Sequence, residues 1–396
     1  SSSPITSCPK PDDRTRKEKN EMNGLMLDDE DGGLALLRES VAGFALRHDG
    51  TAGFRARRVA GTDLDRATWS AMAEAGWLGL LLPEDLGGSG LGLAEQAVLS
   101  EALGRALITE PLAQLSVFAG TLLAAGAETP ERARLAEGLI GGGAVVAPAW
   151  QGRDGSPAPV EARADGDGYL LSGRAEFVSA AESATDFLLL AHAGGEAMLL
   201  GVPAGARGVA IAARPTLDGA RLASVSFDNV AAGAAQVLIR GNAVTPALER
   251  AIAVTRLALA AELSGIATRA IEDTIAFTKE RVQFGRPIAA FQVVQHRLVD
   301  MWADAEFASA AVVNAVETYA QEGGLAGDLA ILAAKARAGD AAVSVTRRAI
   351  HLHGAMGFTD ECDIGLFMKR AVALNATLGQ PEELRLQFVT RERAAA

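Results

Sequence analysis

The sequence predicts an α+β protein with three regions in the order helical, β-rich and helical. Hydrophobic residues make up 49% of the 396 residues but aromatic residues only 5%, so the apolar content is mostly Ala, Leu, Val and Ile, which suit closely packed helices. Apolar residues recur at helical spacing near both ends, whereas the middle consists of short apolar runs between turn residues. We therefore expect a helical domain at 22–140, a β domain at 141–245 and a helical bundle at 246–396.

The first helical region follows a polar segment. Residues 1–21 lack the apolar centre of a secretion signal, and we interpret them as a disordered tail or a remnant of cloning. From Leu34 to about Gly138 apolar residues recur with a helical period. The stretch GLLLPEDLGGSGLG (79–92) interrupts this pattern, because its proline and five glycines force a loop.

The middle region reads as a series of strands. The runs that we expect to be strands are GYLLSG, AEFVS, DFLLLA, AMLLGV, GVAIAA, ASVSF and QVLI. Short strands at regular spacing with Gly and Asp between them indicate a small antiparallel barrel or sandwich rather than alternating β/α units.

The last region returns to helix. Apolar stripes such as Leu259, Leu263 and Ile266 are typical of an antiparallel bundle. Glycine and proline mark the joins between the helices that we expect, at 247–279, 288–322, 326–352 and 382–394.

Charge and composition exclude several classes of protein. A net charge of −12 argues against a general binder of nucleic acid or anionic membranes, which requires a basic face. We expect a soluble protein with no membrane span, since charged residues interrupt the long apolar runs at Arg105, Glu110, Arg256 and Glu262. Two distant cysteines, Cys8 and Cys362, form no disulfide framework, which suits a reducing compartment and makes the cytoplasm the expected location.

Several nucleotide-binding and catalytic motifs are missing from the sequence. It contains no Gly-x-Gly-x-x-Gly that opens a helix after a strand, no Gly-Lys-Ser/Thr loop, no Gly-x-Ser-x-Gly and no His-Glu-x-x-His. His351 and His353 are two residues apart, so on a helix they point in different directions. We therefore expect no metal site and no Rossmann-type nucleotide site.

The segment 281–301, RVQFGRPIAAFQVVQHRLVDM, combines arginine, three glutamines and two phenylalanines around a Gly-Arg-Pro turn. One interpretation is simply a helix end, a turn and an amphipathic helix whose Leu298 faces a core. The other is a phosphate site, because Arg281, Gln283 and Gln292 lie close to a helix terminus, where free N–H groups and a guanidinium can hold a diphosphate. Spacing leaves both interpretations open.

This segment closely resembles the signature of the acyl-CoA dehydrogenase flavoprotein family. Three further segments resemble the family as well: GLLLPEDLGGSGLGLAEQAVLSEALGRAL (79–107), GYLLSGRAEFVSAAESATDFLLL (168–190) and HLHGAMGFTDE (351–361). The resemblance implies the family's fold, which has an N-terminal helical domain, a middle β-barrel or sandwich domain and a C-terminal four-helix bundle.

The resemblance also implies that FAD lies between the β domain and the bundle and reaches a neighbouring subunit, so the protein is expected to be an oligomer. By position, the neighbouring subunit's contribution to this FAD resembles Arg281, Gln283, Phe284, Phe291 and Gln292. The family's Gln-x-x-Gly-Gly segment reads here as His351, Gly354 and Ala355, which departs from the family at the first and last of these positions.

On the flavin-ring side, Phe177 and Ser179 resemble the family's aromatic-x-Thr, in which the aromatic covers the ring and the hydroxyl bonds near N5. The family's Thr-Glu-Pro loop is replaced by Gln151-Gly152-Arg153. Gln151 keeps a hydrogen-bonding side chain there, while the acid and the proline are lost.

Members of this family oxidise an acyl-CoA to its trans-2-enoyl-CoA, and a carboxylate removes the Cα proton. The family's Ile-Tyr-Glu-Gly segment matches NATLGQPEEL, so Leu378 stands where the glutamate is expected. Other relatives carry the glutamate at the position of Thr255, next to Arg256, a candidate substrate contact. Neither Leu378 nor Thr255 can act as the base. Gln380 keeps a side chain able to contact the cofactor.

Three hypotheses follow. The chain is one subunit of a heteromeric acyl-CoA dehydrogenase whose partner brings the glutamate, most like the small subunits that handle dicarboxylyl-CoA, such as pimeloyl-CoA, or steroid side-chain CoA. Alternatively, it is a homotetramer with a relocated base, for which the candidates are Asp360, Glu361, Glu382 and Glu383. The third hypothesis is a non-catalytic flavin-binding or assembly subunit, and a flavin oxidase or monooxygenase is a minor alternative. The resemblance implies electron-transferring flavoprotein as the electron acceptor.

Overall fold

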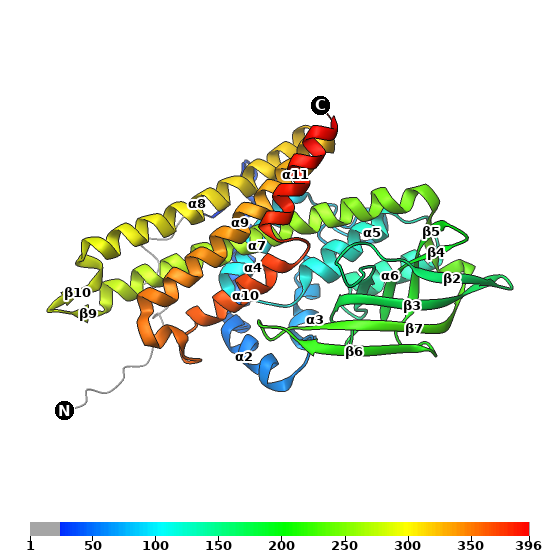
Figure 1. Cartoon of the computed structure of the whole chain (residues 1–396), viewed down its shortest axis with the longest axis horizontal. Helices are drawn as coiled ribbons and strands as arrows, with labels where there is room; N and C mark the ends of the chain where they lie inside the picture. Colours follow the sequence, from blue (N-terminus) through cyan, green and yellow to red (C-terminus); the bar gives the residue numbers. More distant parts are fainter. Residues whose placement is uncertain (1–23, 396) are drawn as a thin grey trace. The chain divides into compact units, whose positions relative to one another are not determined.

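The structure is a computed structural model that describes residues 24–395. The predicted tail at 1–21 and Cys8 lie outside the described residues. The order of elements is helical, β and helical, which confirms the predicted fold class (Figure 1). The chain forms two compact units, the first made of the described residues up to Phe54, Ala97–Ile108 and the chain from Leu259 onward, and the second of Arg55–Gln96 and Thr109–Ala258. The three predicted domain boundaries remain predictions.

The helices that precede the sheet are α1 (Gly33–Arg47), α2 (Gly50–Ala60), α3 (Arg66–Glu74), α4 (Leu93–Ala106), α5 (Ala119–Ala125) and α6 (Pro130–Ile140). Local sequence sets several of their ends. Asp65 caps α3 by accepting from the backbone N–H of Ala67, and Thr129 caps α6 directly before Pro130. The expected loop at 79–92 lies between α3 and α4, where one short 3₁₀ turn, Trp77–Gly79, leads into it and a second, Glu84–Leu86, lies within it.

The second unit contains the sheet. Its strands are β1 (Val146–Ala149), β2 (Val160–Asp165), β3 (Gly168–Ser179), β4 (Asp186–Ala193), β5 (Glu196–Pro203), β6 (Val209–Pro215), β7 (Arg221–Gly233) and β8 (Val237–Arg240). They pair in the order β6-β7-β3-β2-β4-β5-β8, with β1 also on β4. Figure 1 shows the long strands β3, β7 and β6 side by side. Each run that we expected to be a strand lies within one of these strands to within one residue, and the two runs GYLLSG and AEFVS both lie in β3.

The sheet is mixed rather than wholly antiparallel. Both β1 and β2 pair with β4 in parallel, β1 along its first half and β2 at its last residues, while β5 pairs antiparallel on its other edge. Parallel pairing needs a long return connection, and the chain between β1 and β4 is long enough to supply one. The first six residues of β4 are buried, as expected for a central strand with both faces covered.

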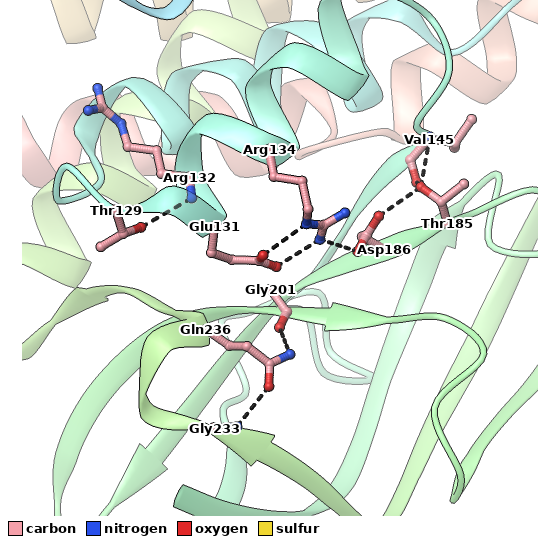
Figure 2. A network of polar contacts seen from close by, with 10 residues as sticks. All are labelled: Thr129, Glu131, Arg132, Arg134, Val145, Thr185, Asp186, Gly201, Gly233 and Gln236. Carbon is pink, nitrogen blue, oxygen red and sulfur yellow. Dashed lines mark hydrogen bonds and ion pairs between the residues drawn. The ribbon is translucent and has the colours of Figure 1, made fainter.

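A polar network fastens α6 to this sheet (Figure 2). The Arg134 guanidinium donates to both carboxylate oxygens of Glu131, one helical turn away, and to Oδ1 of the buried Asp186 at the start of β4, at 2.7 Å. These two carboxylates raise the pKa of Arg134 above its ordinary value. Thr185 Oγ1 donates to the other oxygen of Asp186 at 2.9 Å, so the buried carboxylate is held on both sides.

The helices after the sheet are α7 (Val244–Glu280), α8 (Gln292–Gln321), α9 (Gly324–His353), α10 (Ile364–Ala376) and α11 (Pro381–Ala395). Figure 1 shows α8 and α9 running along each other. The prediction missed α10, which follows a stretch rich in glycine and acidic residues. Its buried residues Ile364, Phe367, Ala371 and Leu374 nevertheless recur at helical spacing, so the signal was present but short.

Glycine lets α4 and α7 cross closely within the first unit. A Cβ at Gly104 would overlap the carbonyl oxygen of Glu262, and a Cβ at Gly265 would overlap that of Glu101. Burial beside this crossing raises the pKa of the Glu101 carboxyl, although Arg105 and Arg38 oppose the shift.

Among the described residues, the segment Gly241–Glu280 is long and apolar enough to cross a membrane by length and composition alone. This differs from the sequence expectation, because Arg256 and Glu262 interrupt the run without removing its apolar character. Most of its most apolar 18-residue window, 83%, is buried in the fold, and a core helix of a soluble protein passes the same test.

Candidate cofactor site

The segment for which the sequence offered a phosphate site begins with a β-hairpin. Strands β9 (Val282–Gln283) and β10 (Arg286–Pro287) pair antiparallel, with Gln283 opposite Arg286. The turn lies at Phe284 and Gly285, both at positive φ (52° and 78°), so only the glycine of the Gly-Arg-Pro sequence belongs to the turn, and Arg286 and Pro287 lie on β10. Phe284 is 93% exposed, and a large apolar ring held outside on a left-handed backbone is a feature of binding sites.

The hairpin packs against the start of α8. The Phe284 and Phe291 rings meet edge to face at 6.1 Å, and the Arg286 guanidinium lies 4.1 Å from the centre of the Phe291 ring. Sequence reasoning missed Arg286. Its position across a two-residue turn from Gln283 was the signal that could have identified it.

Hydrogen-bond donors gather on this segment. Arg281, Gln283 and Gln292 are all exposed, and Phe291 precedes α8 without a side-chain cap. The backbone N–H of Ile288 donates to the Arg281 carbonyl at 2.8 Å, which holds both ends of the hairpin together. A guanidinium, two carboxamides and a helix N-terminus are a donor set that fits a diphosphate. The structure thus brings the five predicted residues of this segment together.

The segment that matches the family's Gln-x-x-Gly-Gly lies at the end of α9. His351 is exposed, and its Nδ1 lies 2.8 Å from Nη1 of Arg297 on α8. Arginine only donates, so Nδ1 of His351 is the acceptor in this contact. Gly354 ends α9 at φ 68° and ψ −145°, a conformation open essentially to glycine alone, and Ala355 follows it on the surface. Sequence spacing gave no sign of Arg297.

His353 points away from His351, as expected for residues two apart on a helix. Its ring is buried, stacks on Phe277 at 4.2 Å between centroids, and its Nδ1 lies 2.8 Å from the Ala349 carbonyl. Burial lowers the pKa of His353 from its ordinary 6.5, although the Ala349 carbonyl and Asp273 oppose the shift.

This burial predicts an acid sensitivity. Because the pKa of His353 is lower in the folded state, the unfolded chain takes up the proton first, so stability is present above pH 6.5 and is lost as the pH falls below it. We expect wild type to lose up to about 1.4 kcal/mol per pH unit relative to His353→Phe below that pH. Urea unfolding between pH 7.5 and 5.5 measures the difference. The exposed His296→Gln should follow wild type, and parallel curves for His353→Phe and wild type would contradict the assignment.

The flavin-ring candidates lie in the second unit, on an irregular part of β3. The register between β3 and β7 shifts between Ala175 and Val178, and Phe177 sits in this bulge at φ 56° with its side chain 48% exposed. Ser179 is half-buried at the end of β3, paired with Leu222. The bulge therefore turns an aromatic ring outward from a strand that is otherwise held in the sheet.

Gln151 lies beside this bulge. Its carbonyl accepts from the backbone N–H of Glu176 at 2.8 Å, directly before Phe177. Its side chain donates to the Gly155 carbonyl at 2.8 Å, which closes the 151–155 loop on itself. The structure therefore places Gln151 next to Phe177, while its carboxamide serves the loop.

Thr255 and Arg256 are buried on α7. Thr255 is 0% exposed, and its Oγ1 has no hydrogen-bond partner within residues 24–395. Thr268 and Thr274, further along the same helix, satisfy their hydroxyls on the carbonyl four residues back. The buried Thr255 hydroxyl could therefore form a hydrogen bond with a polar group of a ligand.

Leu378 lies in the turn between α10 and α11, half-buried and at φ 57°. The exposed Gln380 follows after Gly379.

The carboxylates considered as a relocated base are all exposed, namely Asp360, Glu361, Glu382 and Glu383. Asp360 forms an ion pair with Lys369 at 3.5 Å. Glu382 and Glu383 lie in the first turn of α11, where their negative charges interact favourably with the helix dipole. Asp360, Glu382 and Glu383 therefore have structural roles in the fold. Within the described part of the chain, no three His, Cys, Asp or Glu side chains group as a metal site.

Helical regions before and after a mixed sheet in the chain define an α+β protein, and its exposed Arg/Gln hairpin carries a donor set that fits a diphosphate. Residues 33–140 match the acyl-CoA dehydrogenase N-terminal domain and residues 245–392 match the acyl-CoA dehydrogenase C-terminal domain. The chain belongs to the acyl-CoA dehydrogenase family.

Relatives and solved structures agree with this assignment. Acyl-CoA dehydrogenase IpdE2 of Mycolicibacterium smegmatis is 32% identical over 353 residues, covering 88% of this chain and 95% of the relative. A variant of the Tcur3481-Tcur3483 steroid ACAD superposes with a TM-score of 0.81 at 30% identity, over 92% of this chain and 99% of that one. The ChsE4-ChsE5 complex from Mycobacterium tuberculosis gives 0.81 at 25% identity, over 92% and 96%.

Proposed function

We propose that this chain binds FAD and acts as one subunit of a heteromeric acyl-CoA dehydrogenase, in which an unlike chain supplies the catalytic carboxylate. The observation that carries the proposal is the residue type at the two family positions for the base. Leu378 and Thr255 cannot take a proton, while the donor set for a dinucleotide is retained on the hairpin and the start of α8. A chain that keeps its cofactor residues and lacks its base suits a shared active site.

The residues divide the work as follows. Arg281, Gln283 and Gln292 would hold the diphosphate, and Phe284 and Phe291 would frame it. His351, Gly354 and Ala355 would contribute a second contact in the same unit. Phe177 and Ser179 would meet the flavin ring, which accepts a hydride from the substrate when bound. Gln380 is a further proposed contact, and Arg256 would bind substrate.

A partner chain is supported by exposed apolar side chains on α8. The large apolar side chains that this helix leaves in solvent are Val293, Val299, Trp302 and Phe307, the last of which is 65% exposed. Exposed apolar groups at this density mark protein contacts. We propose that a second acyl-CoA dehydrogenase chain covers them in a dimer or tetramer. The alternatives are a homotetramer with a relocated base and a non-catalytic flavin-binding subunit.

The proposed substrate is an acyl-CoA thioester with a steroid-derived side chain. One similar solved structure, whose title describes a steroid ACAD, supports this choice over a dicarboxylyl-CoA such as pimeloyl-CoA. We propose electron-transferring flavoprotein as the acceptor and the cytoplasm as the location.

The test is cofactor binding together with reduction. We expect the purified chain, alone or with its partner, to bind FAD, and expect acyl-CoA to bleach the flavin only when the partner is present. Arg281→Met should weaken FAD binding by roughly 10- to 100-fold, because it removes a charge-assisted hydrogen bond. Arg347→Met, at an exposed arginine on α9, is the matched control. A colourless protein in both preparations would contradict the proposal, and bleaching of the chain alone would favour the homomeric alternative.

A further inference from the structure

A buried lysine forms hydrogen bonds to the turn between α10 and α11. Lys335 on α9 is 0% exposed. Its Nζ donates to the carbonyl oxygen of Asn375 at 3.3 Å and to that of Gly379 at 3.5 Å. An ammonium group is costly to bury without acceptors, and carbonyls at a helix C-terminus carry partial negative charge. The lysine therefore bridges the last turn of α10 and the residue that follows Leu378.

Further contacts pack the same turn against α9. A Cβ at Gly339, one helical turn beyond Lys335, would overlap the Asn375 side-chain oxygen and lie 3.5 Å from Cγ of Pro381. Further back along α9, Leu332 and Ala336 form a core cluster with Leu384 of α11. The α9 helix thus supports the turn from one side over two successive helical turns.

The turn itself has a strained backbone. Leu378 has φ 57° and Gly379 has φ 111°. This left-handed conformation is unfavourable for an L-residue with a large side chain, and it persists only where the surrounding structure imposes it. The chain has thus kept a strained turn at the position where it has no catalytic carboxylate. Strained backbone of this kind clusters at active sites and ligand-binding sites.

We infer that Lys335 is a positioning residue, which holds the 377–380 turn in the conformation that presents Gln380 to the cofactor. This inference rests on the proposed function for the identity of the cofactor. The geometry that supports it, a buried ammonium joined to both sides of Leu378, belongs wholly to the first unit.

The test combines two readouts on Lys335→Met, which keeps the volume of the side chain and removes its charge. Without the ammonium we expect amide hydrogen exchange in the peptide 374–384 to become at least about 10-fold faster, and FAD to bind about 10-fold more weakly. Lys369→Met, which removes a partly exposed lysine on α10, is the matched control and should change neither.

A second variant separates positioning from general loss of stability. Glycine adopts the left-handed backbone without strain, so Leu378→Gly should restore most of the FAD affinity of Lys335→Met if the lysine acts through this turn. Unchanged exchange in Lys335→Met, or an equal loss of affinity in both backgrounds, overturns the inference. A wild-type chain that binds no FAD overturns the proposed function instead, and the exchange rate then decides whether Lys335 holds the turn.

Discussion

Leu378→Glu is expected to give this chain dehydrogenase activity of its own, with reduction of bound FAD by acyl-CoA about 10²- to 10⁴-fold faster than in wild type. That range is the usual contribution of a positioned general base. The substitution restores a carboxylate at the family position, on a backbone that Leu378 already holds at φ 57°. Glutamate shares this strain with leucine, so the turn is expected to keep its conformation. Single-turnover bleaching of the flavin by acyl-CoA measures the effect.

Leu378→Gln is the matched control, because the carboxamide has nearly the same size and cannot take the proton. The rate with Leu378→Glu should also rise with pH as the carboxyl ionises, and the control should show no such rise. Thr255→Glu offers a second test at the other family position, although a glutamate there would be buried. Equal bleaching rates in Leu378→Glu and Leu378→Gln would show that the turn does not carry a base in this chain.

Arg370→Met is expected to lower the free energy of unfolding by about 3–5 kcal/mol, the usual cost of removing one partner of a buried ion pair. The Arg370 guanidinium approaches Glu262 Oε1 through Nη2 at 2.7 Å and through Nε at 2.8 Å. Each side chain is a tenth exposed or less, so water screens the pair weakly. The variant leaves the Glu262 carboxylate, at the crossing of α4 and α7, without the positive charge of Arg370.

Urea unfolding of three variants separates this pair from ordinary surface charge. Replacing both partners, Glu262→Met with Arg370→Met, should recover much of the stability, since two apolar side chains need no counter-charge. Arg269→Met removes an arginine from a quarter-exposed i,i+4 pair with Asp273 and should cost only about 0.3–0.5 kcal/mol. A loss below about 1 kcal/mol for Arg370→Met would mean that the carboxylate finds another partner or water.

The candidate site shows both how far local patterns reach and where they stop. The grouping of Arg281, Gln283 and Gln292 at a helix end was visible in the sequence, because residues close in the chain stay close in space. The ring contact of Arg286 and the pairing of His351 with Arg297 were not visible. The first depends on where the hairpin turns, and the second joins residues 54 positions apart.

The order helical, β and helical, most strand positions and the lack of a carboxylate at 378 and 255 could all be predicted from the amino-acid sequence. Periodicity, turn residues and residue type are local properties that need no knowledge of the fold. Three contacts became visible only in the folded chain: β4 pairs with both β1 and β2 on one edge, Glu262 pairs with Arg370, and Lys335 reaches the turn at Leu378. Such contacts join distant segments, and they form because buried charges and backbone groups must find partners wherever packing brings them together.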